Sequence, residues 1–217
     1  MKVLLINGSP NRDGCTARAL KEISDTLNKE NIEAEILQIG SMNISGCKAC
    51  GYCKKNNGKC VYNDIVNDVN EKMKEINGIV IGSPVYYSSP NGTLISFLDR
   101  LFHSSNFDKT GIVGASVVSC RRAGNSTSFD VLNKYFTISN MPIASSIYWN
   151  NVHGFTKEDV EKDLEGLQTM RTLARNMAFL MKSIELGKKE FGLPAKEKRV
   201  STPALVYLCA VCALAGG

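Results

Sequence analysis

The sequence predicts an α/β fold: a doubly wound, five-stranded parallel sheet with helices on both faces. Short apolar runs that suit buried strands alternate along the chain with longer segments of helical period. Such alternation is typical of a parallel sheet that is covered on both sides. Three of the apolar runs also end in polar loops rich in Gly, Ser, Asn and Pro, and the carboxyl ends of strands are where open α/β sheets bind ligands.

The individual elements follow from the spacing of apolar residues. Residues 3–6 are continuously apolar, which predicts a strand buried on both faces, whereas residues 32–39 alternate and predict a less buried strand. The remaining strands are expected at residues 78–82, 111–118 and 141–149. Helices are expected at 17–29, 64–76, 93–102, 129–138 and 157–186, with Asp64 and Thr156 as N-caps.

The length of 217 residues suits one domain with appendages. We place the domain at residues 1–187, including a cysteine-rich loop at 40–63, and interpret residues 188–217 as a C-terminal extension. The extension contains an apolar run at 204–215, which is too short to span a bilayer. The run could pack on the domain, be buried in a partner subunit or be a sequence artefact such as a frameshift, and we favour the artefact.

Charge and cysteine usage narrow the functional class. The net charge of +5 is mild and favours anionic small ligands over nucleic acid, which we do not expect as a partner. Met1 leads straight into a strand, so we expect no signal peptide. Four of the eight cysteines are crowded into residues 47–60, a pattern that indicates metal, cluster or redox chemistry in a protein that is not secreted. We therefore predict a cytoplasmic protein without a membrane partner.

The loop at residues 7–16 joins a buried strand to the start of a helix. Ser9, Asn11 and Thr16 supply hydroxyl and amide donors there, and the unpaired N–H groups of a helix N-terminus attract anions. A P-loop is disfavoured because the two glycines of the segment are one residue too far apart and Cys15 occupies the lysine position. The loop therefore predicts a phosphate site, with an ordinary βα turn as the alternative.

Two spaced motifs carry a resemblance to a known family. The first is GSPN at residues 8–11 followed by GCT at 14–16, and the second is SPVY at 83–86 followed by L-x-x-F-x-D-R at 94–100. Together they resemble the two signatures of the NADPH-dependent FMN reductase family, over about residues 1–185. The resemblance implies a flavodoxin-like fold, FMN as cofactor, NAD(P)H as co-substrate and a homodimer or higher homo-oligomer.

The resemblance also implies which residues contact each part of FMN. The phosphate would be held by Ser9, Asn11, Cys15 and Thr16, with Gly14 letting the backbone approach. The isoalloxazine ring would lie along Pro84, Val85, Tyr86 and Tyr87, although the two tyrosines could instead cap the core. The third loop, residues 119–126, would approach the pyrimidine edge of the ring with Cys120, Arg121 and Gly124. Arg121 or Arg122 could instead meet the phosphate of NADPH or be plain surface residues.

No catalytic side chain is expected, because FMN itself carries hydride chemistry. We therefore interpret His103 and His153, the two histidines of the chain, as solvated or capping groups. Asp99 and Arg100 are interpreted as structural, in a salt bridge or a dimer contact.

Four cysteines form a compact motif in the loop at 40–63. Cys47, Cys50, Cys53 and Cys60 have the spacing C-x2-C-x2-C-x6-C. Closely spaced thiolates on a loop suit a [4Fe–4S] cluster, and the motif is similar to that of the iron–sulfur flavoproteins, a branch of the same superfamily. Zinc and a loop without metal are the alternatives.

The favoured functional prediction is an FMN-dependent oxidoreductase. Reducing equivalents would pass from NAD(P)H through FMN to a flavin, a quinone or another small acceptor. One alternative is an iron–sulfur flavoprotein that carries electrons between ferredoxin-type donors and acceptors. A second alternative is a non-catalytic module that binds flavin or metal.

Overall fold

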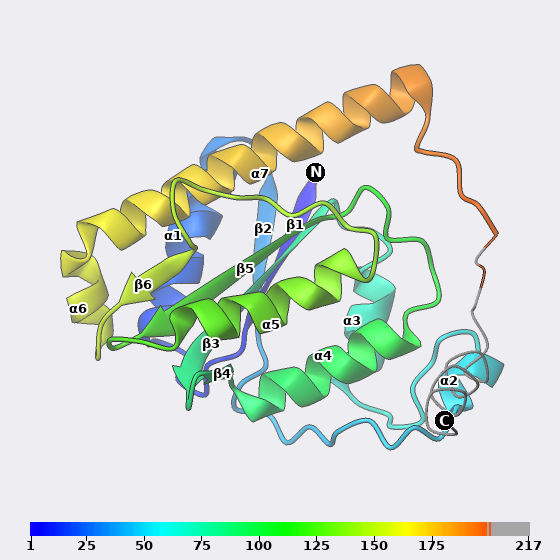
Figure 1. Cartoon of the computed structure of the whole chain (residues 1–217), viewed down its shortest axis with the longest axis horizontal. Helices are drawn as coiled ribbons and strands as arrows, with labels where there is room; N and C mark the ends of the chain where they lie inside the picture. The colour runs from blue at the N-terminus through cyan, green and yellow to red at the C-terminus, as the bar shows by residue number, and fades with distance from the viewer. Residues whose placement is uncertain (199, 201–217) are drawn as a thin grey trace, which may run out of the picture.

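Five parallel strands form one sheet in the computed structural model, which describes residues 1–198 and 200 (Figure 1). The strand order is β2-β1-β3-β5-β6, and the short β4 pairs antiparallel with the end of β3. The bounds are β1 (Lys2–Asn7), β2 (Glu33–Gln38), β3 (Gly78–Tyr86), β4 (Ser89–Pro90), β5 (Val113–Cys120) and β6 (Asn151–His153). The predicted doubly wound parallel sheet is confirmed, with β4 as an added sixth strand.

Seven helices accompany the sheet within the described residues. They are α1 (Cys15–Lys29), α2 (Tyr52–Lys55), α3 (Ile65–Lys72), α4 (Gly92–Ser104), α5 (Asn125–Thr137), α6 (Lys157–Lys162) and α7 (Leu164–Phe191). Residues of α1 and α7 share one core with one face of the sheet, whereas α3, α4 and α5 cover the other face (Figure 1). None of these helices is long and apolar enough to cross a membrane.

The first strand shows why the two layers form. Val3 and Leu5 pack against α1 and α7, whereas Leu4 and Ile6 pack against the helices of the opposite layer. Successive side chains of a strand point to opposite faces, so a continuous apolar run is buried on both. The alternating run of β2 leaves its strand more exposed at the sheet edge, as predicted.

The predicted strand at residues 141–149 is wrong. That segment makes one isolated parallel bridge, between Gly114 and Ile143, and the fifth parallel strand lies at Asn151–His153 instead. The hydroxyl of Ser146 donates to the carbonyl of Tyr148 at 2.6 Å and lies 2.6 Å from Asn150 Oδ1. Such local bonds offer the backbone an alternative to the strand ladder, so the chain turns before it joins the sheet.

The predicted long helix at 157–186 is divided into α6 and α7. Asp163 separates them, with Oδ1 accepting the N–H of Gly166 at 2.9 Å and Oδ2 accepting the N–H of His153 at 2.7 Å. The second helix ends at Phe191, where Gly192 has a φ of 75°. The two predicted N-caps are present: Asp64 accepts the N–H of Val66, and Thr156 takes part in a capping box.

Several segments differ in detail from the predicted pattern. The cysteine-rich loop contains the four-residue helix α2, which the sequence pattern does not predict, and β3 continues through Tyr86 into the second predicted loop, residues 83–92. The apolar run at 204–215, with its Cys209 and Cys212, lies outside the described residues. The domain boundary at residue 187 and the artefact interpretation therefore stay predictions.

Candidate functional site

Three polar loops meet at the carboxyl edge of the sheet. The N–H of Gly8 donates to the carbonyl of Gly82 at 2.8 Å, and Asn91 Nδ2 donates to the carbonyl of Gly8 at 2.7 Å, so the first and second loops are bonded to each other. Thr16 Oγ1 lies 2.8 Å from Ser119 Oγ, which joins the start of α1 to the third loop. In Figure 1 the arrowheads of β3 and β5 end beside β4, at this same edge. The structure thus brings the three predicted loops together.

The first loop is shaped by its own side chains. Asn7 Oδ1 accepts the N–H of Ser9 at 3.0 Å, and Ser9 Oγ accepts the N–H of Asn11 at 3.2 Å. Gln38 on β2 donates its Nε2 to the carbonyl of Ser9 at 2.5 Å. Ser9 and Thr16 are buried beneath the loop, while Asn11 is exposed. The loop is therefore preformed, with Asn11 on its open side.

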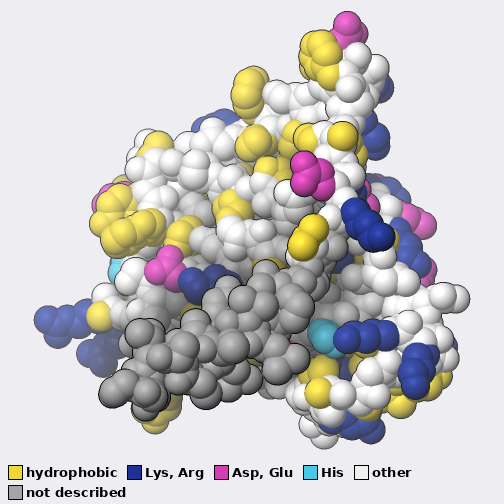
Figure 2. Space-filling model, turned by 45° about the vertical axis from the view of Figure 1, so that its right-hand side comes forward, with side chains coloured by type: hydrophobic (Ala, Val, Ile, Leu, Met, Phe, Trp, Pro, Cys, Tyr) yellow, Lys and Arg dark blue, Asp and Glu magenta, His cyan; other side chains and the backbone are white. Residues whose placement is uncertain are grey.

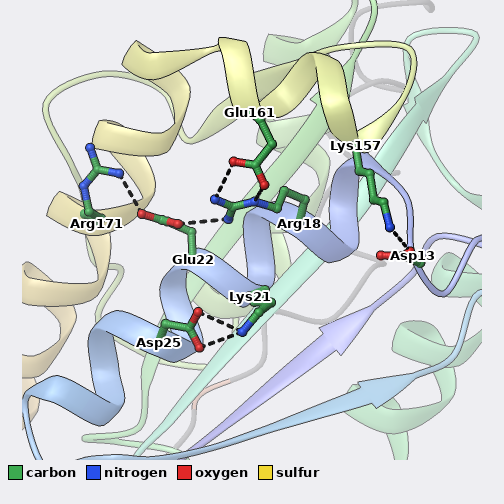
Figure 3. Close-up of polar contacts among 8 residues, drawn as sticks. All are labelled: Asp13, Arg18, Lys21, Glu22, Asp25, Lys157, Glu161 and Arg171. Carbon is green, nitrogen blue, oxygen red and sulfur yellow. Dashed lines mark hydrogen bonds and ion pairs between the residues drawn. The ribbon is translucent and has the colours of Figure 1, made fainter.

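The helix that follows this loop presents a positive end. Its N-cap is Gly14, which has no side chain to occupy the first backbone N–H groups, and its first turn carries no acidic residue. Asp13 would oppose an anion, but it is ion-paired with Lys157 of α6 (Figure 3). Burial raises the pKa of the Cys15 thiol, which keeps this side chain neutral near pH 7. Free N–H groups and a helix dipole at such a site favour an anion.

Charged side chains brace the start of α1 against α6 and α7 (Figure 3). Arg18 is paired with Glu161 of α6 and donates Nη1 to Glu22 at 2.9 Å. Glu22 also accepts Nη1 of Arg171 of α7 at 2.6 Å. Burial raises the pKa of Glu22, but the hydrogen bonds from Arg171 and Arg18 outweigh it, and the pKa is lowered overall. The network fixes α1 relative to the two helices beside it.

Gly40 contacts the backbone of the first loop. A Cβ atom at this position would lie 2.3 Å from the carbonyl oxygen of Gly8 and 2.3 Å from the carbonyl group of Ser9. Since these are backbone atoms, they cannot rotate away. We expect Gly40→Ala to cost about 1–3 kcal/mol in the free energy of unfolding and to weaken FMN binding by about ten- to a hundredfold.

Thermal unfolding and fluorescence titration with FMN test this prediction. Gly187→Ala is the matched control, because a Cβ there meets no atom within 4 Å. Unchanged stability and FMN affinity in Gly40→Ala would mean that the first loop adjusts freely, contrary to the preformed shape.

The second loop is a tight hairpin between β3 and β4. Val85 pairs with Pro90 and Tyr86 with Ser89, so Tyr87 and Ser88 form the two-residue turn. Both have positive φ, 50° and 59°, in the left-handed region that favours glycine or asparagine. The exposed fraction is 46% for Tyr86 and 104% for Tyr87, so neither tyrosine caps the core. A strained turn with an exposed aromatic residue is a feature found at ligand sites.

The third loop approaches the hairpin through Gly124. Gly124 has a φ of 84°, and a Cβ there would lie 2.8 Å from Ser88 Oγ and 3.1 Å from Val85 Cγ1. Pro84 and Val85 are half-buried beside it, and Arg121 is exposed. Gly124 of the third loop therefore contacts Val85 and Ser88 of the hairpin.

Cys120, a predicted FMN contact of this loop, is buried. It is 6% exposed, its Sγ lies 3.5 Å from His153 Nδ1, and burial raises the pKa of its thiol. His153 also lies 2.9 Å from Asn151 Nδ2 and is half-buried, so both of its ring nitrogens have protein neighbours. His103 is exposed, as expected.

The four motif cysteines line one pocket at the far end of the molecule. Cys47 and Cys50 are exposed, Cys53 on α2 and Cys60 are half-buried, and all four are free thiols. The same pocket is lined by Lys48, Tyr62, Arg100 and His103, among others. Figure 2 turns this side toward the viewer and shows lysine and arginine side chains beside a histidine at its lower right. Within residues 1–198 and 200, no three Cys, His, Asp or Glu side chains lie close enough to hold one metal ion.

Helix α4 connects the two regions. Asn91, its N-cap, bonds the first loop, whereas Arg100 and His103 line the cysteine pocket. Eight residues at a rise of 1.5 Å place Arg100 about 12 Å along the axis from Gly92. Figure 1 shows α4 running from β4 toward the loop that holds α2.

The interpretation of Arg100 as part of a structural salt bridge is confirmed. Arg100 is ion-paired with Asp64 at 2.7 Å, and Asp99 instead accepts the hydroxyl of Tyr135 at 2.6 Å. Sequence reasoning missed Gly40, Asn91 and Ser88, which shape the loops without matching either motif. The N-cap pattern of an asparagine before a helix could have identified Asn91.

Comparison with known proteins gives the family and the fold of the chain. The sequence matches the model of the NADPH-dependent FMN reductases over residues 1–156. An iron–sulfur flavoprotein of Methanocaldococcus jannaschii is 31% identical over 193 residues, which cover 85% of this chain and 100% of the relative. RosB, solved with the intermediate 8-demethyl-8-formylriboflavin-5'-phosphate, aligns at a TM-score of 0.68 and 15% identity, over 94% of each chain. A flavodoxin from the Archaea aligns at a TM-score of 0.53 and 14% identity, over 85% of this chain and 99% of its own. The structural likenesses show a flavodoxin-like fold.

Proposed function

Because the chain belongs to the NADPH-dependent FMN reductase family, we propose that it is an FMN-binding oxidoreductase that also carries a [4Fe–4S] cluster. The Methanocaldococcus jannaschii relative is named an iron–sulfur flavoprotein, and we propose the cluster for this chain on its own cysteines. The observation that supports it most is that all four cysteines of the C-x2-C-x2-C-x6-C motif line one pocket. When bound, the two groups together supply both hydride and single-electron chemistry.

The three meeting loops fit FMN. The N–H groups at the start of α1, with Asn11 beside them, would bind the phosphate, and the neutral Cys15 adds no opposing charge. Thr16 would hold the start of α1 in position beneath the phosphate, through the contact of its hydroxyl with Ser119. The strained turn would present Tyr86 and Tyr87 to the ring, and Pro84, Val85, Arg121 and Gly124 would line its other side. Cys120 would support this edge from beneath.

The cysteine loop fits a cluster if its four thiols, which line one pocket, move closer together. Cys47, Cys50, Cys53 and Cys60 would be the ligands, because thiolates are the groups that hold iron–sulfur clusters. Ala49 and Gly51 have positive φ, 53° and 69°, which gives the backbone a tight path around Cys50. Binding of iron would bring together side chains that are separate in the free loop, a coupling that is common for metal sites.

Two classes of electron donor are candidates for this chain. NAD(P)H is one candidate, supported by the exposed Arg121 and Arg122 beside the ring site. A ferredoxin-type donor is the second, supported by the basic side chains around the cysteine pocket, because a positive surface attracts a partner protein with a negative one. In either case we propose a small-molecule acceptor, a homodimer and a cytoplasmic location.

Anaerobic purification of the full chain tests this function. We expect flavin absorbance, a broad iron–sulfur shoulder and about four irons per chain. The loaded protein is then mixed with NADPH, NADH or reduced ferredoxin while flavin bleaching is followed. Rapid bleaching by a nicotinamide identifies a reductase, whereas bleaching by ferredoxin alone identifies an electron carrier. Flavin without iron would overturn the cluster, and no flavin would overturn the proposal as a whole.

A further inference from the structure

Arg100 is the largest side chain that is fully buried in the described structure, with 1% of its side chain exposed. A buried guanidinium is costly unless each of its donors has a partner. This charge lies on α4 and lines the cysteine pocket.

All five N–H groups of the guanidinium have acceptors. Nη1 and Nη2 donate to the two carboxylate oxygens of Asp64 at 2.7 and 2.8 Å, and Nη1 also donates to the carbonyl of Ser45 at 3.3 Å. Nε and Nη2 both donate to Cys60 Sγ, each at 3.4 Å. The guanidinium lies over the ring of Tyr62, at 4.6 Å from its centroid. Two of the five donors thus converge on one cysteine sulfur.

Cys60 is also held by its backbone. Its N–H donates to Asn67 Oδ1 at 2.8 Å, and Asn67 Nδ2 donates back to the carbonyl of Cys60 at 3.2 Å. Cys47 and Cys50, in contrast, are exposed on the preceding loop. Cys60 is therefore the one motif cysteine whose sulfur and backbone are both positioned by helices α3 and α4.

We propose that Arg100 is a positioning residue for the iron–sulfur cluster: its two N–H···S bonds fix the sulfur of Cys60 as a ligand and raise the reduction potential of the cluster. The proposal rests on the cluster in the proposed function. Hydrogen bonds to ligand sulfurs and nearby positive charge favour the reduced, more negative cluster. Asp64 partly offsets the charge of Arg100, so the N–H···S bonds carry most of the effect.

Two substitutions should shift the potential in opposite directions. Arg100→Met removes both N–H···S bonds and leaves the carboxylate of Asp64 near the cluster, so the potential should fall. Asp64→Asn removes the offsetting negative charge and keeps an N-cap for α3, so the potential should rise. A purely structural role for this ion pair would move both variants alike, toward loss of iron.

The experiment is an anaerobic redox titration of the reconstituted full chain, with the cluster followed by electron paramagnetic resonance and the flavin by absorbance. For Arg100→Met we expect about a tenfold shift of the one-electron equilibrium toward the oxidised cluster, which is about 59 mV, with the flavin potential unchanged. Lys59→Met is the matched control. It removes the same unit charge beside Cys60, but Lys59 is exposed and makes no side-chain hydrogen bond in the structure, so solvent screens it.

An unchanged potential in Arg100→Met, or a fall of the same size in Lys59→Met, overturns the proposal. If Arg100→Met does not take up iron, the direction in which Asp64→Asn shifts the reduction potential decides. A higher potential supports the proposal, and an equal or lower potential overturns it. Absence of iron from the reconstituted wild-type chain overturns the cluster itself, and this inference with it. Iron in the wild type with no opposite shifts overturns the role of Arg100 alone.

Discussion

Replacing Cys15 with aspartate is expected to weaken FMN binding by about a thousandfold with little change in the stability of the protein. Cys15 is the first residue of α1 and is half-buried beside the proposed phosphate position. At about 4 Å and an effective dielectric constant of about 20, two unit charges repel by about 4 kcal/mol, which is about a thousandfold in an equilibrium constant. A carboxylate in the first turn also stabilises a helix by about 0.3–1 kcal/mol. Partial burial of this side chain against the core penalises the charge and offsets that gain. The affinity should therefore fall while the stability changes little.

Flavin fluorescence titration and thermal unfolding of the same preparation measure both quantities. Cys15→Asn is the matched control, since it has the shape of aspartate without its charge and should lose little affinity. Stoichiometric FMN in Cys15→Asp would show that the phosphate does not bind at the start of α1.

Replacing Cys50 with serine is expected to abolish iron binding while flavin stays bound. Cys50 is exposed, and its thiol makes no hydrogen bond in the structure, so the substitution should leave the packing unchanged. The hydroxyl of serine is a much poorer ligand for iron than a thiolate. The cysteine pocket is separated from the flavin loops by about 12 Å along α4, so the phosphate site should not be affected.

Iron analysis and the visible spectrum of anaerobically reconstituted protein give the result. Lys54→Ser serves as the control, because it introduces the same side chain at an exposed position of α2 in the same loop. Loss of flavin together with iron would mean that the loop forms part of the flavin site. Retention of iron in Cys50→Ser would remove Cys50 from the ligand set.

The parts of the fold that were predictable are those set by neighbouring residues. The apolar run of β1 identified a strand buried on both faces, and Asp64 and Thr156 marked helix starts, because strand periodicity and capping act within a few residues. The meeting of three loops followed from the parallel sheet, since the carboxyl ends of its strands share one edge.

The parts that failed depend on contacts across longer distances or on competing local bonds. Ser146 draws the backbone out of the predicted fifth strand, and its hydroxyl gives no periodic signal. The break at Asp163 did leave a signal, since an aspartate three residues before Gly166 can cap a second helix. The ion pair of Arg100 with Asp64 joins residues 36 positions apart. The local pattern of a single sequence does not indicate a contact over that separation.

The link made by α4 means that the two candidate centres are not separable modules. The segment from Gly40 to Asp64 leaves the first loop, forms the cysteine pocket and returns under α4, whose N-cap bonds that same loop. Grafting the cysteine segment alone onto another flavodoxin would transfer the thiols without Arg100, which orients one of them. A working transplant would have to start at Gly40 and extend through Ser104, so that the helix travels with the loop it supports.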